Sequence, residues 1–174
     1  MKTSIVVTAT ALALVACDSW GQAAHPTEPQ IAAIVVTANQ VDIDAGELAR
    51  STTKNKEVEK FANQMVTDHS GVNEAATALV TKLHVTPEDN ATSASLKRAG
   101  DDNIQHLKTL SGQAFDRAYI DNEVTYHQNV LDAIDHTLIP TAQNTELKAL
   151  LVKVRPAFEA HLAHAKQIQA SLRH

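Results

Sequence analysis

The stretch VEKFANQMVTDHSGVNEAATALVTKL, from Val58 to Leu83, decides the fold of this chain. Apolar residues recur in it at alternating steps of four and three, a spacing that keeps side chains on one face of an α-helix. The stripe consists of Val58, Ala62, Met65, His69, Val72, Ala76, Leu79 and Leu83. It predicts a long helix with one buried face. His69, in the middle of that face, needs a hydrogen bond or a bound ligand, because burying an unpartnered polar group is costly.

Similar stripes predict three further long helices, at about 30–52, 113–138 and 145–172, beside the one at 56–83. The short polar turn at 51–55 makes the first two helices antiparallel neighbours, with Asn55 as an N-cap. We therefore expect an all-α fold, a four-helix bundle.

The connection between the second and third long helices, 84–112, is long and mostly polar. It carries a weaker helical pattern at about 93–110, so we expect a long crossover that contains a short extra helix. Pro156 lies inside the last predicted helix, where it should cause a bend and leave the carbonyl of Val152 unpaired.

The composition agrees with a helical domain. The chain has 174 residues, 5 Gly and 5 Pro, which fits one domain with few helix breakers. Its net charge of -5 gives no reason to expect nucleic acid or an anionic membrane surface as a partner.

The first 16 residues are typical of a signal peptide. Lys2 precedes an apolar run at 5–14 that is too short to span a bilayer. The sequence LVAC at 14–17 is similar to a bacterial lipoprotein signal, in which Cys17, the only cysteine, is lipidated and becomes the first mature residue. An ordinary secretory signal with an incidental cysteine is the alternative.

The mature chain then divides into a polar tether at 17–29, which contains two prolines, and a bundle domain at 30–174. We expect an exported, periplasmic protein that a lipid on Cys17 anchors to a membrane.

Three histidines interrupt the apolar stripes of three different helices. His69 comes 11 residues after Val58, His127 comes 12 after Phe115, His161 comes 14 after Leu147, and Asp42 comes 11 after Ile31. Since a helix rises about 1.5 Å per residue, these depths differ by only about one turn. The four side chains should therefore lie in one central layer. Three imidazoles and a carboxylate suit a transition metal ion such as zinc, iron, manganese or copper.

Other polar groups lie near these positions. Glu123, one turn before His127, is a second candidate for an oxygen ligand, and His164 can share the face of His161. Asp68 is expected to support or cap the site rather than to bind the ion. A buried polar network without metal is the alternative. The remaining histidines are expected to be exposed to solvent: His25, His84, His106, His136 and His174.

Several phrases in the sequence resemble a widespread family of exported bacterial proteins of unknown function, which carry the label outer membrane protein and are placed with ferritin-like bundles. The matching phrases are Phe61-Ala62, Met65 to His69, Leu110 to Gly112, Phe115 to Tyr119, His127, and Pro156 followed by His161, with Asp42 as the acidic residue. The resemblance covers about 31–172. It implies an exported ferritin-like four-helix bundle with a long crossover, and it brings no established activity.

The chain departs from the pattern of di-iron ferritins, which carry Glu-x-x-His on two helices. Met65 and Thr67 precede His69, and Phe158 precedes His161 by three residues, so neither helix carries the glutamate of that pattern. A histidine-rich site for a single metal ion fits better.

Three functions remain open from the sequence. The first is a metal-binding protein for buffering or stress protection. The second is a redox metalloenzyme that acts on oxygen species. The third is a structural or interaction module with a metal-free histidine network. No Ser-His-Asp order or glycine-rich phosphate loop in the sequence indicates a hydrolase or a nucleotide enzyme.

Overall fold

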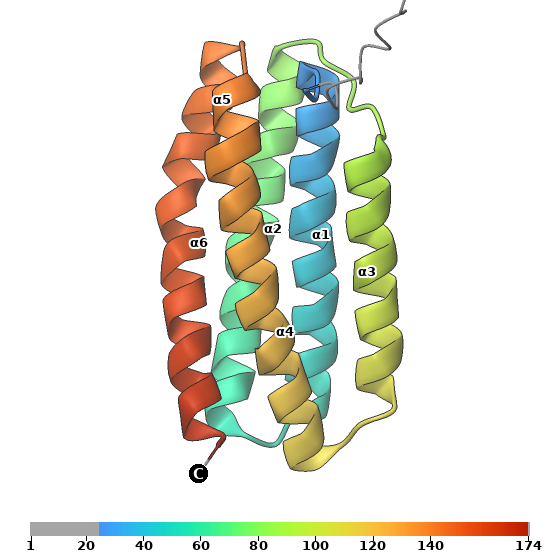
Figure 1. Ribbon diagram of the computed structural model, residues 1–174, viewed down its shortest axis with the longest axis vertical. Helices are drawn as coiled ribbons and strands as arrows, with labels where there is room; N and C mark the ends of the chain where they lie inside the picture. Colours follow the sequence, from blue (N-terminus) through green and yellow to red (C-terminus); the bar gives the residue numbers. More distant parts are fainter. Residues whose placement is uncertain (1–24, 174) are drawn as a thin grey trace, which may run out of the picture.

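Long helices lying side by side make up the part of the chain that the computed structural model describes, residues 25–173 (Figure 1). The elements in chain order are α1 (Glu28–Thr52), α2 (Lys56–Lys82), α3 (Ala91–Lys108), α4 (Gly112–Ala133), the π-helical turn η1 (Ile134–Leu138), α5 (Ile139–Thr141) and α6 (Thr145–Ser171). No strand occurs within this range. The predicted all-α bundle with a crossover helix is confirmed. The predicted signal peptide and the lipidation of Cys17 fall outside the described residues.

The helix starts follow from local sequence. Asn55, predicted as an N-cap, accepts hydrogen bonds from the backbone N–H groups of Glu57 and Val58. The first helix begins at Glu28, two residues earlier than the predicted 30, and so takes in the end of the predicted tether. Pro29 does not prevent this, because a proline in the first turn of a helix loses no intrahelical hydrogen bond.

The third long helix also extends further than predicted. It was expected to end at 138, before Pro140, but helical structure continues through α5. The preceding turn is π-helical, and the N–H of Ile139 bonds to the carbonyl of Ile134, five residues earlier. We attribute the continuation to this wider turn, which makes room for the proline ring.

The last long helix continues through Pro156. Pro156 offers no N–H donor to the carbonyl of Val152, and Val152 itself is 54% exposed, on the outer face of the helix. The bend expected at Pro156 stays a prediction.

The four bundle helices form a square of neighbours, and α3 lies outside it. In Figure 1, α1 runs down, α2 runs up, the crossover returns through α3, and α4 and α6 form the second antiparallel pair. The crossover helix packs on α1, and Asn103 of α3 donates a hydrogen bond of 3.1 Å to Asn122 of α4. The helix α4 then begins at Gly112, whose φ of 56° lies in the left-handed region that glycine tolerates. No helix between residues 25 and 173 combines the length and the apolar character that crossing a membrane requires.

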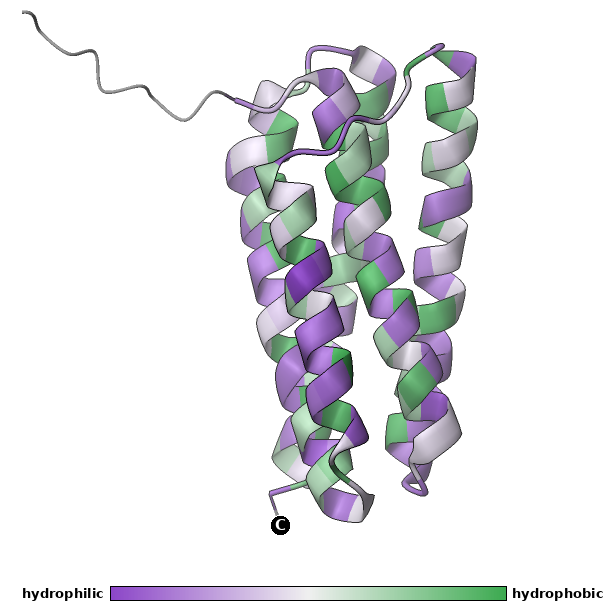
Figure 2. Cartoon of the chain, turned by 90° about the vertical axis from the view of Figure 1, so that its right-hand side faces the viewer, coloured by the Kyte–Doolittle hydropathy of each residue, from purple (hydrophilic) through white to green (hydrophobic). Residues whose placement is uncertain are grey.

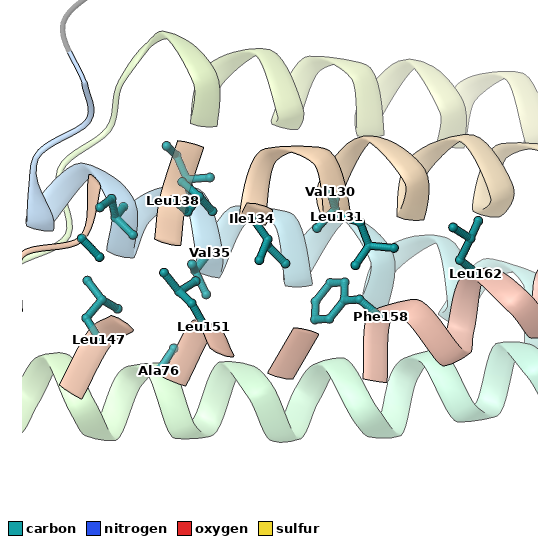
Figure 3. Close-up of a cluster of buried hydrophobic side chains, with 13 residues drawn as sticks. Val35, Ala76, Val130, Leu131, Ile134, Leu138, Leu147, Leu151, Phe158 and Leu162 are labelled. Atoms are coloured by element: carbon teal, nitrogen blue, oxygen red, sulfur yellow. The ribbon is translucent and has the colours of Figure 1, made fainter. Parts of the chain in front are cut away.

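Two hydrophobic clusters fill the bundle, one near each end. Along the helices, hydrophobic and hydrophilic bands alternate, as expected for helices with one buried face (Figure 2). The upper cluster, at the end where α1 begins, includes Ile31, Ile34, Val35, Ala76, Val130, Leu131, Ile134, Leu138, Leu147, Leu151, Phe158 and Leu162 (Figure 3). The lower cluster includes Ala45, Val58, Phe61, Ala62, Met65, Phe115, Tyr119, Ile120, Ala165 and Ile168. Between them lies a set of buried polar residues that we call the polar layer: Asn39, Asp42, His69, Glu123, His127 and His161.

Candidate metal centre

Each of the four bundle helices contributes one side chain to the centre of the polar layer. Asp42 comes from α1, His69 from α2, His127 from α4 and His161 from α6, and all four are at most 2% exposed. The imidazole centroids lie 5.3 to 5.6 Å apart. The structure thus brings together the four residues that the sequence placed at one depth.

Two of the histidines are fixed by acceptors on their outer side. Nδ1 of His69 lies 2.8 Å from Oδ1 of Asn39. The amide of Asn39 is itself oriented, because its Nδ2 donates to the carbonyl of Val35 at 2.8 Å. Nδ1 of His127 lies 3.0 Å from the carbonyl oxygen of Glu123. Since both acceptors are oxygens, Nδ1 is the donor in each ring, and in the neutral form of the ring Nε2 keeps a lone pair.

His161 is oriented the other way round, with Nε2 rather than Nδ1 as its outer nitrogen. Its Nε2 lies 2.8 Å from Oδ2 of Asp68, a carboxylate on the neighbouring helix α2. This nitrogen therefore donates, and Nδ1 keeps the lone pair. Hydrogen bonds from the outer nitrogen to a carboxylate or carbonyl are the arrangement that orients metal-bound histidines.

The inner atoms of these residues have no hydrogen-bond partner among the described residues. They are Nε2 of His69, Nε2 of His127, Nδ1 of His161 and both carboxylate oxygens of Asp42. Oδ2 of Asp42 lies 3.0 Å from Nε2 of His69 and 3.4 Å from Nε2 of His127, without hydrogen-bond alignment. The three histidines also offer ligand atoms within 4.8 Å of one another. Asp42 groups within that distance with Glu123 and His127 instead. Ligands bound tetrahedrally at about 2.0–2.1 Å from zinc are separated by about 3.4 Å, so the three histidines and Asp42 would have to close in to share one ion.

The charges of the layer favour a cation at its centre. Burial raises the pKa of Asp42. The neighbouring His69, followed by His127 and His161, lowers it by more in total, so that the pKa ends below its usual value. Burial lowers the pKa of His161 despite the hydrogen bond to Asp68. Burial lowers the pKa of His127 as well, but the hydrogen bond to Glu123 and the charge of Asp42 raise it above its usual value. The layer thus combines a carboxylate that favours its ionised form with one ring, His161, that favours its neutral form.

Glu123 occupies a different side of the layer. Its Oε2 lies 3.4 Å from Nδ1 of His127, the nitrogen that faces away from Asp42. Burial, followed by the negative charge of Asp42, raises the pKa of Glu123 to about 7. Asp42, Glu123 and His127 do form a second group with ligand atoms within 4.8 Å. Of the two oxygen ligands considered from the sequence, Asp42 is therefore the one that faces the free histidine nitrogens.

His164, the further histidine considered from the sequence, lies away from the centre, and so do the neighbouring side chains of Met65 and Tyr126. Met65 is part of the lower cluster. His164 is half-buried and packs edge-on against Phe61, with ring centroids 5.3 Å apart. Tyr126 donates a hydrogen bond of 2.6 Å to the carbonyl of Ala38. The histidines expected at the surface are exposed at His25, His84, His106 and His136, and His174 falls outside the described residues.

Sequence reasoning missed Asn39, the acceptor for His69. Its position carried a signal, because it lies three residues before Asp42 and therefore on the same face of α1. Asp68 was expected beside the site, but its partner, His161 on another helix, was not.

Three comparisons place the chain among known proteins. A family model described as a domain of unknown function, DUF4142, matches residues 18–168. A crystal structure of a Streptomyces coelicolor protein, described as a secreted DUF305 protein, has a TM-score of 0.68 over 82% of this chain and 91% of that one. The two sequences are 12% identical, so this likeness concerns the fold alone. No curated protein matches. Because the family model spans most of its length, the chain belongs to the DUF4142 family, a family defined by a domain of unknown function.

Proposed function

We propose that this chain is an exported metal-binding bundle that holds one transition metal ion through His69, His127, His161 and Asp42. The observation that carries the proposal is the coincidence of the unpartnered atoms with the ligand set. Leaving a buried polar atom without a partner costs about 1–3 kcal/mol. Here such atoms converge from three imidazoles and a carboxylate, and one cation would satisfy them together.

The alternative, a metal-free histidine network, fits the geometry less well. In such a network each ring would bond to its neighbours across the layer. Instead, the hydrogen bonds of the rings go outward, to Asn39, to the carbonyl of Glu123 and to Asp68. The inner nitrogens remain unpartnered, which supports an ion rather than a network.

The ligand chemistry limits which metal ions suit the site. Three nitrogens and one carboxylate oxygen suit zinc, and also iron, manganese or copper, whereas magnesium and calcium prefer all-oxygen sites. Every ligand is buried, which suits retention and buffering of the ion more than turnover of a large substrate. Metal buffering or stress protection is therefore the role that we propose.

Export is supported by the structural neighbour, which is described as secreted. We further propose that the protein is periplasmic and is anchored to a membrane by a lipid on Cys17. We also propose that it belongs with the ferritin-like bundles that carry the label outer membrane protein. Mass spectrometry of the mature protein should show a lipid-modified Cys17 at its N-terminus. An unmodified cysteine, or cleavage elsewhere, would contradict the anchor.

The test of the metal site is elemental analysis and metal titration of the purified mature protein. We expect about one ion per chain, bound through nitrogen and oxygen. The His69→Ala variant should bind none, whereas His136→Ala, which removes an exposed histidine, should bind as the wild type does. Metal content that survives His69→Ala together with His161→Ala would reject the site. Assays of wild-type turnover with peroxide and superoxide separate buffering from redox catalysis.

A further inference from the structure

A cleft of about 350 Å³ between α2 and α6 reaches the proposed metal centre from the surface. His69 and His161, both buried, belong to its lining. Nearer the surface the lining includes Asp68, Gly71, Lys153 and Ala157. Small residues on both helices keep this part of the cleft open. Indeed, a Cβ atom added at Gly71 would have no heavy atom within 4 Å, apart from its own backbone.

Two further cavities do not lead to the ligands. One, of about 260 Å³, lies near the C-terminal end of α6 and is lined by Arg117, Asp121, Gln169, Leu172 and Arg173. The other lies higher in the bundle. It has a volume of about 200 Å³, is mostly apolar and extends between α3 and α4. Its lining includes Asn39 and Phe158 but none of the four proposed ligands. The cleft between α2 and α6 is therefore the better connection between solvent and the polar layer.

His161 differs from the other two histidines in what its outer nitrogen contacts. The outer nitrogens of His69 and His127 bond to buried groups, the amide of Asn39 and the carbonyl of Glu123. The outer nitrogen of His161 bonds instead to Asp68, whose side chain is 41% exposed while that of His161 is 3% exposed. One imidazole thus has one nitrogen toward the centre and one toward a carboxylate in the cleft.

From this geometry we infer that metal ions enter and leave the bundle through the cleft between α2 and α6, and that Asp68 and the outer nitrogen of His161 hold the ion transiently on its way. The inference rests on the function proposed above. The Asp68 carboxylate attracts the hydrated cation, and Nε2 of His161 becomes a ligand once its proton is displaced. The ion then moves to the inner atoms as the ring reorients. Lys153 at the same mouth opposes a cation, so it should slow loading.

A bulky side chain introduced into the cleft tests whether it is the passage for the ion. Gly71→Trp places a bulky side chain in open space, and replacing a glycine in a helix interior does not weaken the helix. Loading and release of Co²⁺ would be followed by stopped-flow absorption, and the dissociation constant by competition with a chelator. We expect both rates to fall by about tenfold or more, with an unchanged dissociation constant, because a blocked passage slows both directions equally. Ala78→Trp, on the exposed side of the same helix and outside the cleft, is the matched control.

Charge variants test the mouth of the cleft. Asp68→Asn, which leaves an oxygen acceptor for His161, should slow loading several-fold at low ionic strength and less in salt. Lys153→Ala should speed it.

The outcomes separate the two proposals. A wild-type protein that binds no Co²⁺, Zn²⁺, Cu²⁺, Fe²⁺ or Mn²⁺ overturns the metal-binding function. A wild-type protein that binds Co²⁺, together with a Gly71→Trp variant that loads and releases it at wild-type rates, overturns the passage alone. The passage is also overturned if Gly71→Trp changes only one of the two rates, since the substitution then acts on the bound or the free state.

Discussion

The lower hydrophobic cluster and the polar layer above it differ in whether their buried groups find partners within the fold. In the cluster, Phe61 and Phe115 both pack on Tyr119, with ring centroids 6.2 and 6.5 Å away. Their stabilisation comes from contact and burial and needs no ligand. In the layer, Asp42 and the inner histidine nitrogens lack partners. The apolar contacts of the cluster are therefore complete as folded, and the Tyr119 hydroxyl is its one buried polar side-chain atom without a partner in the described part of the chain. The layer leaves several buried polar atoms unpartnered, a cost that the proposed ion would offset.

The largest expected effect comes from opening the cluster. Phe61→Ala removes a fully buried ring and should lower the free energy of unfolding by about 3–5 kcal/mol. Chemical denaturation of the metal-free and the metal-loaded protein should show a similar loss, because Phe61 lies outside the layer. If the loss caused by Phe61→Ala differed clearly between the metal-free and the metal-loaded protein, the cluster and the layer would not be independent.

Metal addition is the next largest effect, and it should act only through the layer. At a free ion concentration about 1,000 times the dissociation constant, binding should add about 4 kcal/mol to the free energy of unfolding. His69→Ala should abolish this gain, and Phe61→Ala should keep it. The measurement is thermal denaturation with and without the ion, with His136→Ala as the control. A gain that persists in His69→Ala would place the ion elsewhere.

A smaller effect should follow from the acceptor behind His69. Asn39→Ala removes the oxygen that holds Nδ1 of His69 and should weaken metal affinity by about 10–100-fold. Competition titration measures this, and Asn63→Ala, on the exposed face of α2, serves as the control. An unchanged affinity would mean that packing alone orients the ring.

The smallest effect should come from the outer surface. Arg155 forms a two-pronged ion pair with Asp135, at 2.6 and 2.8 Å, and both side chains are about a third exposed. Asp135→Asn should therefore lower the free energy of unfolding by only about 0.2–1 kcal/mol. The hydrogen bond from Arg155 lowers the pKa of Asp135. The contribution is thus fully present above the pKa of an unfolded aspartate, about 3.9, and disappears as the pH falls through the lower folded value.

Denaturation at several pH values checks this sign. The difference between the wild type and Asp135→Asn should shrink as the pH drops below about 4. A difference that grows in acid would contradict the assignment.

The helices were predictable because each carries a long apolar stripe, and the depth of the four central side chains was predictable because a helix has a constant rise. By contrast, the orientation of each ring depends on partners from other helices. His161 bonds to Asp68, and nothing in the spacing of either residue shows that α2 and α6 are neighbours.

The sequence pattern also did not predict where the third long helix ends or where the crossover helix packs. The continuation of the third long helix past Pro140 depends on a π-helical turn, which no residue type indicates. Likewise, the pattern at 93–110 predicted a helix but not its place outside the square, against α1.

Each of the four proposed ligands comes from a different helix. An ion held by all four would join the helices into a single cooperative unit, because no helix can unwind at mid-height without breaking a coordinate bond. Amide hydrogens at the centres of α1, α2, α4 and α6 would then exchange with solvent together, in openings that release the ion, while those of α3 exchange independently. In this protein, losing the ion and loosening the backbone would be the same event.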